Sequence, residues 1–165
     1  MTIAEPFVAE LTREAATTRR VLERVPEDKL SWRPHAKSMS LGQLAMHVAT
    51  IPSFVSDLIS VDQFELTSST PEVATSRAAL LTALDRTIAH ATRTLTGMGD
   101  ARMMAEWKLT RAGRTLLTLP RVGVVRGLML NHWYHHRGQL SVYLRLLDVP
   151  VPSIYGPSAD ENPFA

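Results

Sequence analysis

Histidines are the residues with the clearest chemical potential, and three of the six lie close together at His132, His135 and His136. On an α-helix, His132 and His136 are about one turn apart, so their side chains share a face and can converge on one ion. His47 lies on the apolar stripe of another segment with helical spacing. Three neutral imidazoles can hold a divalent ion and leave coordination positions open for water or substrate, as catalytic zinc sites do. The pattern therefore predicts a metal site at His47, His132 and His136.

The residue types limit the chemistry of this site. Nitrogen ligands suit zinc, nickel, copper and iron, so they do not select one metal. The chain has no cysteine, which excludes thiolate zinc sites, disulfides, iron–sulfur clusters and a cysteine nucleophile. Any thiol that takes part must therefore come from solution. The competing interpretation is a set of core histidines that hydrogen-bond their neighbours, and the paired spacing with a third inward histidine favours the metal instead.

The remaining histidines are predicted to stay outside the ligand set. His135 is one residue from His136, about 100° around a helix, so we expect it beside the site or on the surface. His35 in a loop and His90 off the apolar stripe of its helix are predicted to be exposed. Gln139 follows His136 by three residues and is a candidate hydrogen-bond partner for that ring or for a bound water.

The spacing of His132 and His136 matches the outer histidines of the HExxH metalloprotease motif. Trp133 stands where that motif has its glutamate base, so this class of protease is excluded. A base would have to be supplied by the ion's own water or by another side chain. No single residue stands out among the candidates Tyr134, Glu106, Asp160 and Glu161.

Four segments carry apolar residues at spacings of three and four, which is typical of amphipathic helices. They cover residues 3–25, 40–58, 70–97 and 120–148. Proline residues follow the first and the last, and Gly97 is a plausible end of the third. Ser40 with Gln43 has the spacing of a capping box, and Thr70 is predicted to cap the third helix with Pro71 in its first turn.

Two local features qualify this helical pattern. Pro52 lies inside the second helix and removes the hydrogen bond to the carbonyl of Val48, so we expect a kink there. Residues 107–109 and 115–117 flank a glycine-containing turn and predict a small hairpin. The sequence therefore predicts an all-α four-helix bundle with long connections and a hairpin between the third and fourth helices, in one domain over residues 1–165. Bundle cores commonly hold metal sites.

Charge and hydropathy bear on partners and location. The net charge is +2, and the 18 Lys and Arg residues are scattered among 16 Asp and Glu residues. Nucleic-acid binding needs a concentrated basic patch, so none is expected. The uncharged stretch between Lys37 and Asp57 contains many polar residues and is predicted to be a buried helix rather than a membrane span. The N-terminus lacks the pattern of a signal peptide, so we expect a cytoplasmic protein without a membrane partner.

The segment over residues 131–140, NHWYHHRGQL, followed by Tyr143-Leu144-Arg145, resembles the DinB family of damage-inducible, metal-dependent proteins. Further similarity lies in SWRP at residues 31–34, in SMSLGQL at residues 38–44 with His47, and in the tail over residues 151–160. The resemblance implies a four-helix bundle that forms a homodimer and holds its metal with three histidines. Carried to this sequence, these are His47, His132 and His136.

The resemblance leaves the reaction open, because related branches include thiol-dependent transferases and isomerases. We expect a metal-dependent enzyme, with zinc or nickel favoured, that acts on a small molecule. The ion would activate water in a hydrolase or an exogenous low-molecular-weight thiol in a transferase. The alternative is a stress-associated metal-binding or interaction protein without turnover. In the same motif, Gly138 predicts close approach of a neighbouring helix or partner chain.

Overall fold

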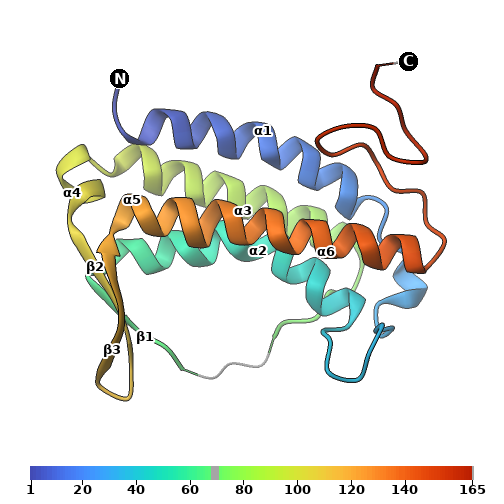
Figure 1. Ribbon diagram of the computed structural model, residues 1–165, viewed down its shortest axis with the longest axis horizontal. Coiled ribbons are helices and arrows are strands. Elements are labelled where there is room, and N and C mark those ends of the chain that lie inside the picture. Colours follow the sequence, from blue (N-terminus) through green and yellow to red (C-terminus); the bar gives the residue numbers. More distant parts are fainter. Residues whose placement is uncertain (68–70, 165) are drawn as a thin grey trace.

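The computed structural model describes residues 1–67 and 71–164. Figure 1 shows the long helices lying side by side, with a small sheet at one end of them. The mostly helical architecture confirms the predicted bundle, and the sheet is the departure from a purely α-helical class. The elements, in chain order, are α1 (Ala4–Leu22), η1 (Glu27–Lys29), α2 (Leu41–Ser60), β1 (Gln63–Glu65), α3 (Arg77–Gly97), α4 (Asp100–Met104), β2 (Glu106–Arg111), β3 (Arg114–Pro120), α5 (Arg121–Val124), η2 (Val125–Asn131) and α6 (His132–Leu146).

The helix α2 occupies the centre of the fold, packed against α3 and α6, while α1 packs against α3. Its start follows the predicted capping box. The Ser40 hydroxyl accepts a hydrogen bond from the Gln43 amide at 3.2 Å, and the Gln43 side chain accepts one from the Ser40 amide at 2.9 Å. Figure 1 shows α2 changing direction along its length, as expected from Pro52. The predicted apolar stripe of this helix is buried, at Leu44, Val48, Ile51, Val55 and Leu58.

The C-terminal end of α2 is held by side chains from later in the sequence. The last carbonyls of a helix have no partners within it. The Trp107 indole donates to the Leu58 carbonyl at 2.8 Å, and the Arg121 Nε donates to the Ile59 carbonyl at 2.9 Å. Arg102 donates to the Ser60 carbonyl at 3.2 Å. These contacts attach the sheet and α5 to the helix that carries His47.

The third predicted helix begins later than expected. Thr70, the predicted cap, lies outside the described residues, and Pro71 is not helical. The helix α3 starts at Arg77 instead, because the Ser76 hydroxyl accepts the amide of Ala79 at 3.0 Å and caps it. The helix ends at Gly97, as predicted.

The hairpin between the third and fourth helices is confirmed. Strands β2 and β3 pair antiparallel, and Ala112 and Gly113 at their turn have φ angles of 50° and 74°. A two-residue turn with positive φ at both positions matches the twist of a hairpin. The sequence did not predict β1, which adds a third strand parallel to β2.

The fourth predicted helix is continuous in path but not uniform. A π-helical segment, η2, lies between α5 and α6 and ends at Asn131, immediately before the first histidine of the motif. π-Helical turns occur mostly as local insertions within α-helices and are frequent at functional sites, because the wider turn redirects the side chains near it. This segment therefore sets the direction in which the motif enters the bundle.

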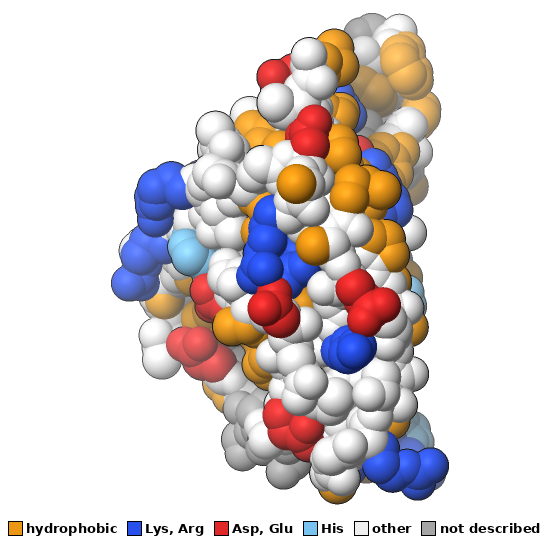
Figure 2. All heavy atoms as spheres, turned by 90° about the vertical axis from the view of Figure 1, so that its left-hand side faces the viewer, with side chains coloured by type: hydrophobic (Ala, Val, Ile, Leu, Met, Phe, Trp, Pro, Cys, Tyr) orange, Lys and Arg blue, Asp and Glu red, His pale blue; other side chains and the backbone are white. Residues whose placement is uncertain are grey.

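Charges of both signs are mixed on the outer surface. Figure 2 shows Lys and Arg side chains interspersed with Asp and Glu on the end of the molecule that it presents. The absence of nucleic-acid binding stays a prediction. Within the described ranges, no helix is both long and apolar enough to cross a bilayer.

Two acidic side chains hold the C-terminal tail on the bundle. Asp160 accepts hydrogen bonds from the Arg145 guanidinium and from the Val151 amide, the latter at 2.8 Å. Glu161 accepts from the Ser153 amide at 2.9 Å and pairs with Arg20. These partners lower the pKa of both carboxyl groups below their ordinary values, chiefly through Arg145 for Asp160 and through the Ser153 amide for Glu161.

Acidification is expected to release the tail. Because the folded-state pKa of Asp160 lies below the ordinary value of 3.8, its contribution is complete above that pH and is lost as the pH falls through the lowered pKa. The amide shift of Val151, followed by NMR, should therefore titrate with a midpoint below pH 3.8. In Arg145→Met the midpoint should move up toward that value, and an unchanged midpoint would show that Arg145 does not stabilise the carboxylate.

Candidate metal centre

The three predicted histidines meet in the fold. His47 comes from α2, and His132 and His136 lie at the start of α6. One ring nitrogen from each lies within 4.8 Å of the others, and all three side chains are half-buried. The ring centroid of His47 lies 5.3 Å from that of His132 and 4.6 Å from that of His136. The described part of the chain adds no cysteine or carboxylate to this cluster.

Neighbouring groups act on two of the three rings. The Nδ1 of His136 lies 2.7 Å from the Gln139 Oε1, as the spacing in the sequence suggested. The backbone carbonyl of Leu128, one turn before, raises the pKa of the His132 ring, against the larger effect of burial. Because the Gln139 Oε1 is an acceptor, the His136 ring donates through Nδ1 and keeps the lone pair of Nε2 for a metal. Metal-binding histidines are commonly fixed in this way by a carbonyl or carboxylate on the far nitrogen.

The Nε2 atoms of His132 and His136 face each other. They lie 2.6 Å apart. At this distance the two nitrogens either share a proton in a hydrogen bond or bind a common cation. Two nitrogens bound to one tetrahedral ion at about 2.0–2.1 Å lie roughly 3.3 Å apart, a small adjustment for two side chains on one helix. The donor set therefore fits a divalent transition metal.

The electrostatic environment keeps the rings neutral. Burial lowers the pKa of His136 to about 4, against the opposing effect of Gln139. Burial is also the main cause that lowers the pKa of His47 and of His132, with a neighbouring imidazole adding to it in each case. A histidine must be neutral to bind a metal. All three rings are therefore in the binding form at neutral pH.

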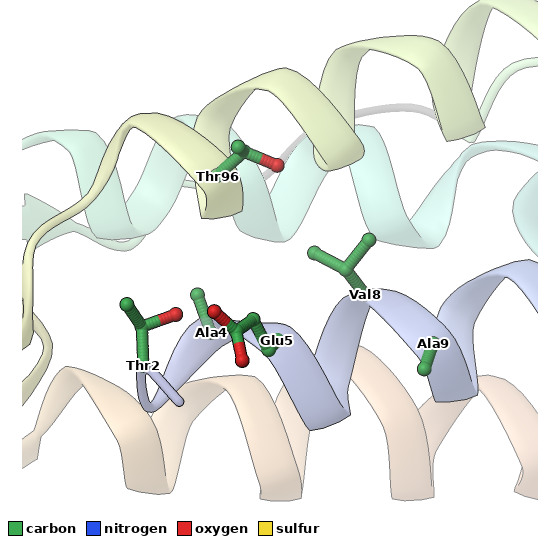
Figure 3. Close-up of a pocket in the computed structure, with 6 residues that line it drawn as sticks. All are labelled: Thr2, Ala4, Glu5, Val8, Ala9 and Thr96. Carbon is green, nitrogen blue, oxygen red and sulfur yellow. The ribbon is translucent and has the colours of Figure 1, made fainter.

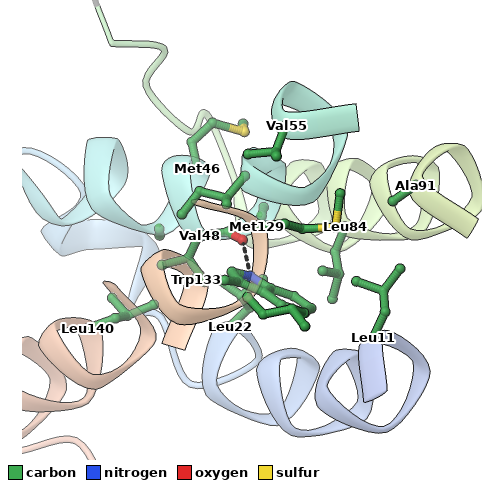
Figure 4. Packing of buried hydrophobic residues seen from close by; sticks show 14 of the residues in the cluster. Leu11, Leu22, Met46, Val48, Val55, Leu84, Ala91, Met129, Trp133 and Leu140 are labelled. Atoms are coloured by element: carbon green, nitrogen blue, oxygen red, sulfur yellow. Dashed lines mark hydrogen bonds between the residues drawn. The ribbon is translucent and has the colours of Figure 1, made fainter. Parts of the chain in front are cut away.

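The proline in α2 is connected to the same site. Pro52 has no amide hydrogen, so it leaves the carbonyl of Val48 without its helical partner. The Trp133 indole donates to that carbonyl at 2.7 Å, within a core where the Trp133 side chain is fully buried (Figure 4). Val48 follows His47, and Trp133 follows His132. The bond therefore ties the two elements of the cluster together next to the histidines themselves.

Replacing Trp133 with phenylalanine should lower the free energy of unfolding by about 1–3 kcal/mol, because the buried Val48 carbonyl loses the indole N–H that donates to it. The double variant Trp133→Phe/Pro52→Ala should recover most of this loss, since alanine restores the helical amide. Chemical denaturation measures both values. Additive losses in the double variant would show that the Trp133 indole does not replace the amide hydrogen that Pro52 lacks.

The other chemistry-bearing residues lie elsewhere. His135 is exposed, with its ring centroid 5.0 Å from that of His136, and His35 is exposed as predicted. His90 is half-buried rather than exposed, because its Nε2 bonds the Asp57 carboxylate at 2.8 Å. Each candidate base has another partner: Tyr134 donates to Glu10, Glu106 pairs with Lys108, and Asp160 and Glu161 hold the tail.

Two features of the motif were not anticipated. Arg137, next to His136, is only 1% exposed and forms an ion pair with Glu14 at 2.7 Å. An arginine beside a histidine gives no sign of burial in the sequence, because its partner lies far away on α1. Gly138 is exposed, and a Cβ built there would meet nothing within 4 Å. The predicted close approach is therefore wrong for a neighbouring helix of this chain.

Two hollows on the surface differ in their relation to the histidine cluster. One hollow lies between the start of α1 and the end of α3 and is lined by residues such as Glu5, Val8 and Thr96 (Figure 3). None of its described lining residues is a histidine. A second cavity, of about 180 Å³, is lined by apolar side chains and by His132. The cluster therefore has an adjoining cavity.

The comparisons with known proteins agree with this architecture. The model of the DinB family matches residues 2–163. The chain belongs to the DinB family. A DinB-like protein from Bacillus cereus shares 24% identity with this DinB-family chain at a TM-score of 0.72, with 92% of this chain and 97% of that chain covered. A DinB-like protein from Bacillus subtilis shares 19% identity at a TM-score of 0.69, with 91% of this chain and 97% of that chain covered. These TM-scores show a shared fold. No curated protein matches the sequence significantly.

Proposed function

We propose that this DinB-family protein is a metal-dependent enzyme whose divalent ion is held by His47, His132 and His136. The observation that carries the proposal is the convergence of one ring nitrogen from each of the three histidines within 4.8 Å. Zinc and nickel are the favoured ions, since both accept imidazole ligands. When bound, the ion supplies Lewis acidity that lowers the pKa of a water or thiol reaching it.

The protein's own residues prepare the site in three ways. Gln139 fixes the ring of His136, so that its Nε2 atom faces that of His132. The Trp133 bond to Val48 keeps α2 and α6 in register. Three protein ligands leave a coordination position for a reactant, as in catalytic rather than closed structural sites.

Two reaction classes fit this arrangement. Activation of water would give a hydrolase, and activation of a low-molecular-weight thiol would give a transferase. The thiol would be exogenous, because the chain has no cysteine. We further propose that the substrate is a small molecule and that the protein acts as a cytoplasmic homodimer.

Metal analysis and a two-arm activity panel test the proposal. Protein purified without chelator should contain about one transition-metal ion per chain. Metal-free and reloaded samples are then compared on ester and amide substrates, and on electrophiles supplied with small thiols. Metal-dependent turnover in one arm supports the proposal and selects the reaction class. Absence of stoichiometric metal, or of turnover in both arms, would overturn it.

The second candidate is a metal-binding or interaction protein without turnover. It is favoured by one observation: within the described residues, no carboxylate joins the histidine cluster, and the candidate bases have other partners. A stoichiometric ion that is held tightly and gives no turnover in either arm of the panel would support this candidate.

A further inference from the structure

The cavity beside His132 has a consistent chemical character. It lies between α2, the sheet, the π-helical segment and the start of α6. Eight of its nine described lining residues are apolar and none is charged, with His132 the exception in polarity. They are Ile51, Phe54, Val55, Leu58, Phe64, Leu66, Leu109, Leu128 and His132. A charged group placed here would lose its hydration without gaining a partner.

The rim of the cavity is also apolar. Phe54 is 51% exposed and Leu66 is 39% exposed, which leaves large hydrophobic side chains open to water at the entrance. Phe54 and Phe64 meet edge to face, with their centroids 5.9 Å apart. Grouped exposed apolar residues at the mouth of a cavity mark a binding site more often than scattered ones.

The cavity and the metal centre share residues. His132 belongs to both, and Leu128, one helical turn before it, lines the cavity. A molecule whose apolar part filled the cavity would therefore present its other end to the histidine cluster. The volume of about 180 Å³ limits the size of that part. An engineered apolar cavity of about 150 Å³ accommodates benzene.

We propose that this cavity binds an apolar, uncharged group of the substrate, equal in size to one six-membered carbon ring or an alkyl chain of about six carbons. The inference rests on the proposed metal-dependent function and adds the class of substrate to it. It predicts a substrate with two parts: an apolar group for the cavity, and a polar reacting group that reaches the metal.

Straight-chain alkyl hydroxamates test this directly, because their head group binds transition metals and their tail length is adjustable. Their affinities for zinc-loaded protein are measured by calorimetry, without reference to activity. Each added methylene that leaves water should tighten binding about fourfold. We expect about a 250-fold gain from acetohydroxamate to hexanohydroxamate, which adds four methylenes, and no further gain to decanohydroxamate.

Two variants form a matched pair. Leu66→Glu places a charge at the rim of the cavity, and Leu117→Glu makes the same change on β3, outside it. The two leucines are 39% and 41% exposed, so neither variant should disturb folding. Leu66→Glu should remove most of the gain with chain length, while Leu117→Glu should keep it. Equal behaviour of the two variants would overturn the assignment.

The outcomes separate this inference from the proposed function. If acetohydroxamate binds but affinity is independent of chain length, the cavity assignment is wrong and the metal site stands. If no zinc binds, the proposed function is wrong, and toluene added to metal-free protein decides the cavity. Saturable shifts of the Leu109 and Leu128 methyl signals in NMR spectra would then support it, and unshifted signals would overturn it.

Discussion

His132→Ala is expected to abolish stoichiometric metal binding. The substitution removes one of three nitrogens that converge within 4.8 Å. Loss of an outer hydrogen-bond partner typically reduces metal affinity by about 10–100-fold, so loss of the ligand should exceed about 100-fold. Competition with a chromophoric chelator measures zinc affinity, and elemental analysis measures content.

His135→Ala is the matched control for this prediction. It removes an imidazole from the same turn of α6, but His135 is exposed and lies outside the cluster. Its zinc affinity should stay within about threefold of the unmodified protein, well short of the loss expected for a changed outer partner. Circular dichroism checks that both variants keep their helices. If His132→Ala retains one ion per chain, the ligand assignment is wrong.

The helices and the histidine cluster were predictable because their causes are local. The i,i+4 spacing of His132 and His136 places them on one helical face, and the capping box at Ser40 fixes where α2 begins. The position of His47 on an apolar stripe then points it inward. Helical geometry thus selects the same three residues that the fold brings together.

The features that escaped prediction depend on contacts distant in sequence. The start of α3 at Arg77, rather than at the earlier Thr70-Pro71 pattern, has a local cap at Ser76 and also a distant contact, because the Arg77 amide donates to the Glu27 carboxylate at 2.7 Å. Strand β1 is only three residues long and exists through pairing with β2. The π-helical segment before His132 leaves no compositional trace. Each outcome was decided by tertiary packing rather than by local propensity.

Arg137 is the clearest case of a distant contact within the motif, and it carries the second large prediction. Its guanidinium donates to the Glu14 carboxylate at 2.7 Å, to the Thr18 hydroxyl at 3.1 Å and to the Tyr155 hydroxyl at 2.6 Å. The Tyr155 hydroxyl donates to the same carboxylate at 2.9 Å. The network joins α1, α6 and the C-terminal tail beside the metal centre.

Arg137→Met should lower the free energy of unfolding by about 3–5 kcal/mol, because Glu14 would be left as an unpaired charge in the interior. The double variant Arg137→Met/Glu14→Leu should recover most of this loss, since apolar side chains can replace a buried pair at little cost. Arg126→Met, which breaks the exposed pair with Glu10, should cost no more than about 1 kcal/mol. Urea denaturation gives all three values. Equal losses for Arg137→Met and Arg126→Met would mean that burial does not set the strength of the Arg137 network.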